Sequence, residues 1–142
     1  MEIKLEPRGF KAAVAAAKRN PKKLRQRTKQ GLSRIAQIGI NIIQDRTADG
    51  VGYKDGAFKP YSESYAAFRR KKDRTLTPNL TISGNMLGAM TSKANHRKAE
   101  IFFRGAKESK KAAFNNQTRP FFGFSRDEQT KLLTAFERFI TK

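Results

Sequence analysis

The chain has 142 residues, enough for one domain with a modest hydrophobic core. It contains no cysteine, which excludes a disulfide framework, a thiolate metal site and a cysteine nucleophile. Its 31 Lys and Arg against 12 Asp and Glu give a formal net charge of +19, which favours contact with nucleic acid or acidic protein surfaces. No run approaches the roughly 20 apolar residues that cross a bilayer. We therefore expect no membrane partner. The absence of cysteine fits synthesis in a reducing cytoplasm.

The first 20 residues are expected to form a basic N-terminal arm. Apolar and charged side chains alternate in residues 1–6, which permits a short strand that Pro7 ends. The alanine-rich stretch from Gly9 to Arg19 then predicts a helix.

A long helix is predicted from Asn20 and Pro21 to about Arg46. Asn can cap a helix through its side-chain oxygen, and Pro fits the first turn because no amide partner is required there. Apolar side chains then recur at spacings of three and four, the pattern of one helix face. They are Leu24, Leu32, Ile35, Ile38 or Gly39, and Ile42, widened near the end by Ile40 and Ile43. The first half of this helix is nearly all positive and should be exposed.

Two segments, residues 47–61 and 74–83, are expected to be extended loops because they combine Gly and Pro with no helical or strand period. Between them, Ser62 is a suitable cap for a short helix that reaches about Lys72. We expect this helix to carry its RRKK run outside. The side chains expected to face inward are Tyr65 and Phe68.

The next region predicts a short helix and a hairpin. Ser83 can cap a helix that carries Met86, Leu87 and Met90. Residues 91–105 follow as a hairpin whose second strand alternates apolar side chains at Ala99, Ile101 and Phe103. Residues 106–116 show no clear period and fit a helical turn that ends in a pair of asparagines.

A final helix is predicted after the aromatic stretch RPFFGFS, residues 119–125. Ser125 and Glu128 have the spacing of a capping box, in which each side chain satisfies an amide at the start of the helix. We expect Pro120 and Gly123 to shape a turn and the phenylalanines of the stretch to pack under the helix. Its expected apolar face is Leu132, Leu133, Phe136, Phe139 and Ile140.

The order of these elements predicts the fold class. We expect a single α+β domain over residues 1–142. It should contain a small antiparallel β-sheet packed with one long helix and a C-terminal helix, plus long irregular loops. The sequence contains no internal repeat, so a solenoid is not expected.

Residues that could carry catalysis or bind a metal are few. His96, the only histidine, lies in the predicted hairpin turn with no orienting carboxylate or nucleophile nearby. Asp45, Asp49 and Asp55 lack the spacing of a calcium loop. The glycines in residues 50–56 are not followed by the Gly-Lys-Ser/Thr of a phosphate loop. We therefore expect no enzymatic activity, no metal and no cofactor.

Three stretches of the sequence occur in an order shared with a known family. They are DGAFKPYSESYAAFRRKK (55–72), LTISGNMLGAM (80–90) and KAAFNNQTRPFFGFSRDEQTKLLTAFERFI (111–140). Together they resemble the phage virion morphogenesis family, the tail completion or head–tail neck proteins of tailed bacteriophages. In the last stretch the matching positions are Arg119, Pro120, Phe121, Gly123, Ser125 and Asp127. Phe114 stands where the family often has histidine, and the basic N-terminal third matches nothing in particular.

The resemblance implies a structural, non-enzymatic virion protein. Such a protein forms an oligomeric ring at the neck or tail end, where it completes the tail or joins it to the DNA-filled head. Its implied partners are other copies of itself, neighbouring neck, connector or tail proteins, and the genomic DNA in the lumen. We expect the two loops to supply the contacts because they combine aromatic residues with no local period. The candidate interface residues are Tyr53, Phe58, Pro60, Tyr61, Leu76, Pro78 and Arg119.

A basic nucleic-acid-binding module is the alternative. Its cations would lie along phosphates through Lys18–Lys29 and Arg69–Lys72, with an affinity that falls as salt rises. The residues proposed for contact with DNA or an acidic partner are Lys18, Arg19, Lys22, Lys23, Arg25, Arg27, Arg69, Arg70, Lys71 and Lys72. No signature of a recognition helix or an aromatic sheet face accompanies them.

Overall fold

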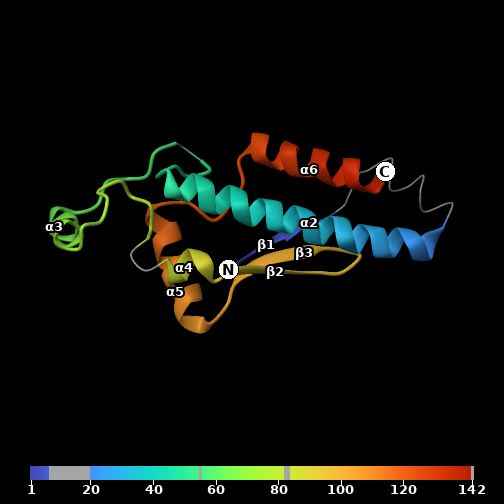
Figure 1. Ribbon diagram of the computed structural model, residues 1–142, viewed down its shortest axis with the longest axis horizontal. Helices are drawn as coiled ribbons and strands as arrows, with labels where there is room; N and C mark the ends of the chain where they lie inside the picture. Colours follow the sequence, from blue (N-terminus) through green and yellow to red (C-terminus); the bar gives the residue numbers. More distant parts are fainter. Residues whose placement is uncertain (7–19, 55, 82–83, 142) are drawn as a thin grey trace.

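The computed structural model of the protein describes residues 1–6, 20–54, 56–81 and 84–141, which form an α+β fold. The expected helix from Gly9 to Arg19 lies outside these residues. In chain order the elements are β1 (Glu2–Leu5), α2 (Pro21–Ala48), α3 (Glu63–Lys71), α4 (Asn85–Gly88), β2 (Met90–Ala94), β3 (Ala99–Phe103), α5 (Ala106–Thr118) and α6 (Arg126–Thr141). Figure 1 shows α2 with the sheet on one side and α6 beside it. These elements, together with α4 and α5, are here called the body. The predicted fold class is confirmed.

The sheet is antiparallel, with strand order β1-β3-β2. Ile3 lies opposite Ile101, and Met90 lies opposite Phe103, so apolar side chains share one face. Helix α2 packs over β2 and β3 on this face, and α6 lies near β1, where Leu5 and Phe136 line a common depression. The core of the body therefore lies between the sheet and these two helices.

On the other face of the sheet, Glu100 is surrounded by lysines. Lys98 Nζ lies 2.6 Å from one carboxylate oxygen, and Lys93 Nζ lies 3.1 Å from the other. Hydrogen bonds from Lys98 and Lys93 lower the pKa of the Glu100 carboxyl below its ordinary value. These pairs link the β2–β3 hairpin across its charged face.

Helix α2 begins as the sequence predicts. Asn20 Oδ1 accepts a hydrogen bond from Lys23 N at 3.1 Å, and Pro21 occupies the first turn. The helix ends at Ala48, two residues beyond the predicted end. A Cβ on Gly39 would lie 2.7 Å from the ring of Phe124, so the missing side chain lets an aromatic ring pack directly on the helix.

The aromatic stretch forms a buried turn ahead of α6. Phe121, Phe122 and Phe124 are all buried, which confirms the predicted packing. Asn116 Oδ1 accepts hydrogen bonds from Phe121 N at 3.1 Å and Phe122 N at 3.0 Å. The side chain at the end of α5 thus replaces the backbone partners that an irregular turn lacks.

Helix α6 begins with the predicted capping box. Ser125 N donates to Glu128 Oε2 at 2.9 Å, and Glu128 N donates to Ser125 Oγ at 3.2 Å. The same carboxylate receives Arg46 Nη1 from the last turn of α2, 2.6 Å from Oε1. Arg46 Nη2 donates to the carbonyl oxygens of Phe121 at 2.6 Å and Gly123 at 3.1 Å. One guanidinium therefore joins the end of α2, the aromatic turn and the start of α6.

Two predictions about the elements after α3 were wrong. Met90 is the first residue of β2 rather than part of the short helix, whose cap position is Gly84, whereas Ser83 lies outside the described residues. Residues 106–118 form the complete helix α5, not a single turn. Its only buried residue is Ala112, so no apolar stripe marks it in the sequence.

Two side chains expected to face inward are exposed instead. Phe68 is 44% exposed because the body does not cover α3, although its ring stacks on Tyr65 with centroids 5.8 Å apart. Leu133 is 46% exposed, whereas its neighbour Leu132 is buried.

Replacing Arg46 with methionine tests the connection between α2 and α6. Arg46→Met leaves the partly buried Glu128 carboxylate and two carbonyl oxygens without their guanidinium, so we expect a loss of about 3 kcal/mol in the free energy of unfolding. Urea denaturation followed by circular dichroism measures it. The control Lys29→Met, at an exposed position on the same helix, should change stability by less than about 0.5 kcal/mol. Equal losses in the two variants would contradict the role of Arg46.

Candidate assembly site

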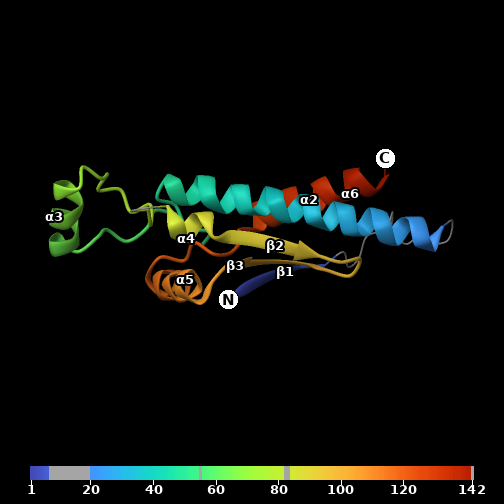
Figure 2. The same cartoon turned by 60° about the horizontal axis from the view of Figure 1, so that its bottom comes forward.

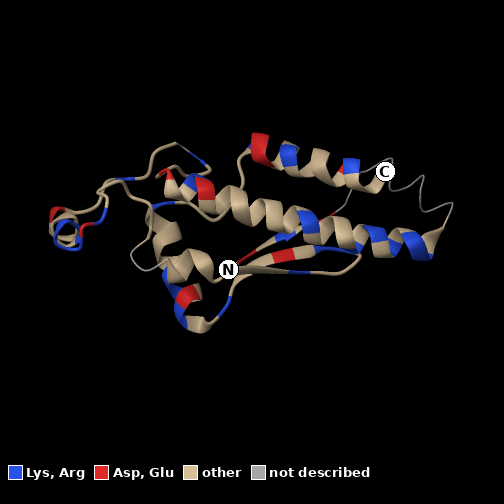
Figure 3. Ribbon diagram, in the orientation of Figure 1, with Lys and Arg blue, Asp and Glu red and all other residues tan. Residues whose placement is uncertain are grey.

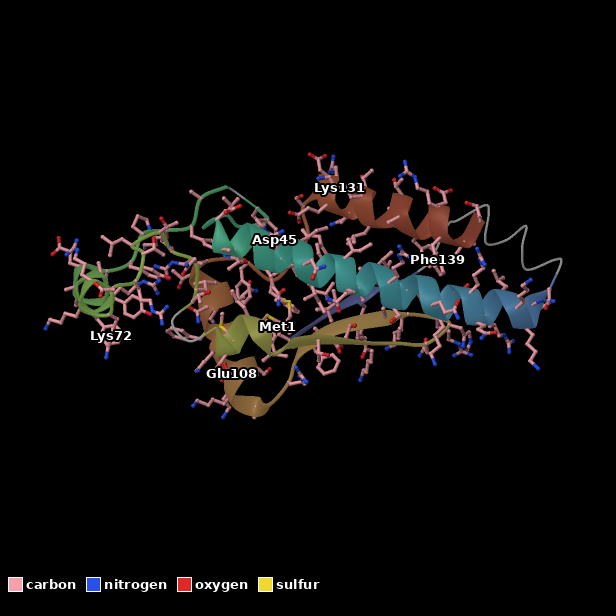
Figure 4. All side chains as sticks on the ribbon, viewed as in Figure 1. Met1, Asp45, Lys72, Glu108, Lys131 and Phe139 are labelled. Atoms are coloured by element: carbon pink, nitrogen blue, oxygen red, sulfur yellow. The ribbon has the colours of Figure 1, made fainter. Side chains whose placement is uncertain are left out.

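Residues 59–81, here called the α3 projection, extend away from the body. Figures 1 and 2 show α3 beyond the end of α2 in both views, clear of the sheet and of α6. Ser62 Oγ accepts a hydrogen bond from Tyr65 N at 3.3 Å, so the predicted cap of α3 is confirmed. The side chain of Lys72 lies on this projection, far from Met1 and Phe139 in Figure 4.

A buried guanidinium organises the α3 projection. Arg69 is 1% exposed. Its Nε donates to Thr75 O at 2.8 Å, Nη1 to Thr81 O at 3.0 Å and Nη2 to Asn79 Oδ1 at 3.2 Å. These bonds hold the returning segment, residues 75–81, against α3. The projection thus has a polar centre of its own in place of a hydrophobic one.

A second guanidinium fixes the base of the projection. Arg119 Nε donates to Lys59 O at 2.8 Å, and its Nη2 donates to Pro60 O at 2.9 Å. Both Arg119 and Arg69 lie over the ring of Tyr61, 4.7 and 4.9 Å from its centroid. The Tyr61 hydroxyl accepts a hydrogen bond from Leu80 N at 3.1 Å. Cation–π contacts and hydrogen bonds therefore tie both limbs of the projection to the end of α5.

The surface of the projection combines exposed apolar side chains with an excess of positive charge, and its exposed acidic residues are Glu63 and Asp73. Phe68 and Leu76 are large hydrophobic side chains exposed there, and Leu76 is 43% exposed. The exposed cations beside them are Arg70, Lys71, Lys72 and Arg74. A segment held in shape by buried polar contacts, with apolar side chains facing solvent, can bind another protein without a large ordering cost.

The structure places the predicted interface residues in different environments. Pro60 and Leu76 are exposed, and Pro78 is half-buried. Phe58 was expected at an interface but is buried in the core of this chain. Tyr53 packs against the aromatic turn, where a Cβ on Gly123 would overlap its ring. Tyr61 and Arg119 are half-buried and contact each other within the chain, since Arg119 lies over the Tyr61 ring and donates to Pro60 O. Their contact with a partner stays a prediction.

The predicted cations do not form one surface. The N-terminal half of α2 and the α3 projection lie at opposite ends of the molecule (Figure 3). Lys22, Lys23 and Arg25 are exposed at the first end, and Arg70, Lys71 and Lys72 at the second. Lys18 and Arg19 lie outside the described residues.

Two of the predicted cations serve the fold. Arg69 is buried, so its assignment to a polyanion contact was wrong. Arg27 donates from Nη2 to Phe139 O at 3.1 Å and from Nε to Ile140 O at 3.3 Å. These bonds satisfy carbonyl groups in the last turn of α6, which has no intrahelical donor for them.

The β2–β3 hairpin adds cations to the first end. Its turn carries His96 and Arg97, both exposed, and Ser92 of β2 lines a shallow depression together with Lys29 of α2. The hairpin turn therefore extends toward the N-terminal half of α2 (Figure 1). We call the exposed cations Lys22, Lys23, Arg25, Lys29 and Arg97 the basic end.

Within the described part of the chain, the structure groups no His, Cys, Asp or Glu residues into a possible metal site. Asp55, one of the three aspartates considered from the sequence, lies outside that part. Among the same residues, no helix has both the length and the apolar character of a membrane span. Comparison with models of known protein families, with curated proteins and with solved structures gives no significant match.

The sequence does not show that Arg69 is buried and holds the projection together. It stands in the run RRKK beside Arg70, and composition does not distinguish the two. The signal lies further along the chain, where Thr75, Asn79 and Thr81 supply the oxygens that select Arg69.

Replacing Arg69 with methionine tests whether it holds the α3 projection. Arg69→Met removes three hydrogen bonds from residues 75–81, so we expect faster amide hydrogen exchange in that segment by about tenfold or more, with α2 and β3 unchanged. Exchange followed by mass spectrometry measures each segment separately. The matched control Arg70→Met, at the exposed neighbour, should exchange like the wild type. Similar exchange in both variants would show that Arg69 does not organise the projection.

Proposed function

We propose that this protein is a structural, non-enzymatic subunit of the neck or tail end of a tailed bacteriophage. In this role it assembles into a ring that completes the tail or joins it to the DNA-filled head. The α3 projection is the observation that carries the proposal. It is organised by Arg69 and Arg119, yet it exposes Phe68 and Leu76 away from the core.

A ring requires one face of a subunit to meet a different face of the next copy. The α3 projection and the body are suited to such a heterologous contact because they present different surfaces. The projection offers exposed aromatic and aliphatic side chains, whereas the body offers the edge of the sheet at β2. The motifs that resemble the phage family also coincide with this region, since residues 55–72 and 80–90 form most of the projection and the segment after it.

The charge of the chain supports a place among acidic neighbours or beside DNA. At +19, identical subunits repel one another unless partners compensate the charge. Neighbouring neck, connector or tail proteins, and the genome in the lumen, are the partners we propose. The virion is the proposed location.

The double variant Phe68→Ser, Leu76→Ser tests the assembly contact. It removes two exposed apolar side chains. We expect the variant to keep its circular dichroism and to form fewer higher oligomers than the wild type at high salt, where the repulsion between identical +19 subunits is screened. Loss of each side chain removes about 1.5–3 kcal/mol from the free energy of association at every contact between subunits. That loss is enough to dissociate a ring at micromolar concentration. Light scattering after size-exclusion chromatography reports the mass, and complementation of phage lacking the gene reports particle yield.

Leu133→Ser is the matched control, because Leu133 is equally exposed but lies on α6, away from the projection. It should assemble and complement normally. Infectious particles at normal yield from the double variant would overturn the proposed role of the projection.

The basic end supports a second candidate, a nucleic-acid-binding module. Its five cations are exposed and come from the N-terminal half of α2 and from the hairpin turn, which lie at the same end of the molecule. If they bind duplex DNA, affinity should fall with salt, and the logarithmic slope should drop by roughly three when three phosphate contacts are removed. The variant that combines Lys22→Gln, Lys23→Gln and Arg25→Gln should therefore lose most of that slope.

The matched control changes Arg70, Lys71 and Lys72 to glutamine at the other end of the molecule. Fluorescence anisotropy with a labelled duplex measures both variants across a salt series. A stable monomer with a steep slope that depends only on the basic end favours the second candidate. Equal slopes for both variants indicate attraction by overall charge and leave the basic end without a DNA site.

A further inference from the structure

A groove of about 740 Å³ lies where the α3 projection meets α5. The projection contributes Tyr61, Tyr65 and Leu80 to its lining, and α5 contributes Phe114 from its second half. Phe114 is 73% exposed, more than any other large hydrophobic side chain of the described residues. The groove therefore offers apolar surface that this chain leaves uncovered.

The charged groups of the groove are all of one sign. Lys59, Lys111 and Arg119 line it, and no Asp or Glu is among the described residues of its lining. Lys111 Nζ has a carboxylate partner outside the lining, Glu108 Oε1 at 3.4 Å on the same helix. Arg119 is held in place by its bonds to Lys59 O and Pro60 O, so its charge is fixed at the edge of the groove.

We propose that this groove binds an extended acidic segment, with at least one aromatic or aliphatic side chain, from a different protein. Apolar side chains of the segment would cover Phe114, and its carboxylates would face the three cations. Charge complementarity selects this occupant. A second copy of the chain fits less well, since each copy carries a charge of +19. The proposal deepens the proposed function, on which it rests only for the partner being a virion protein.

Single-stranded nucleic acid is the competing occupant, because its bases could stack on exposed aromatic rings. The groove favours a peptide because apolar surface predominates in its lining, whereas binding of a nucleic-acid strand depends chiefly on its phosphates. The experiment therefore includes an oligothymidine competitor.

The test uses fluorescence anisotropy with a labelled octapeptide of six glutamates around a phenylalanine–leucine pair, at physiological ionic strength. A second peptide has serine in place of both apolar residues. We expect the wild-type chain to bind the first peptide about tenfold more tightly than the second, a difference of about 1.4 kcal/mol. Phe114→Ser should abolish the preference, and Lys111→Glu should weaken binding of both peptides about tenfold.

Neighbouring positions on α5 provide matched controls. Ala113→Ser and Lys110→Glu alter exposed residues that do not line the groove, so both should bind like the wild type. Equal affinity for the two peptides, or equal losses in Lys110→Glu and Lys111→Glu, would overturn the proposal. Oligothymidine that displaces the peptide and loses affinity in Phe114→Ser would assign the groove to nucleic acid and overturn it as well.

The assembly assay separates this proposal from the proposed function. Phe114→Ser should still form oligomers, because the groove is distinct from the exposed Phe68 and Leu76. Oligomers without peptide binding would reject the groove alone. Peptide binding by a chain that never assembles would reject the ring alone.

Discussion

The contact between Arg46 and the start of α6 is the constraint on which the rest of the body depends. Arg46 lies in the last turn of α2 and Glu128 in the first turn of α6, yet the two residues are 82 positions apart in the sequence. The Glu128 carboxylate that binds Arg46 also accepts a hydrogen bond from Ser125 N. The same group therefore caps α6 and attaches it to α2. Arg46 Nη2 also donates to the carbonyl oxygens of Phe121 and Gly123, which fixes the aromatic turn beside both helices.

The same chemical solution recurs along the chain. Arg27, Arg69 and Arg119 each donate to backbone carbonyl groups that secondary structure leaves without partners. Arginine suits this role because its planar group carries five donors and stays charged when partly buried. Part of the net charge of +19 is therefore structural. It stabilises irregular segments that a chain with only 37% hydrophobic residues could not hold by apolar packing.

Local signals in the sequence predict most elements but not their long-range partners. The caps Asn20, Ser62 and Ser125 act within three residues of themselves, so spacing alone reveals them. Phe58 lies in a loop that has no helical or strand period. It is buried by residues far away in the sequence, so the residues around it do not predict its burial. Arg69 and Arg70 are identical in type and adjacent, and only the returning segment decides which is buried. Helix α5 escaped prediction because it buries little apolar surface.

The α3 projection and the groove at its base share Tyr61. Its hydroxyl binds the returning limb at Leu80, its ring contacts both Arg69 and Arg119, and it also lines the groove. A segment bound in the groove would therefore contact Tyr61, the residue that joins both limbs of the projection to α5. Removing solvent from Tyr61 and Arg119 strengthens their cation–π contact, because water no longer screens it. In the proposed assembly, a partner bound at the groove would thus stabilise the projection in the orientation that the next subunit meets.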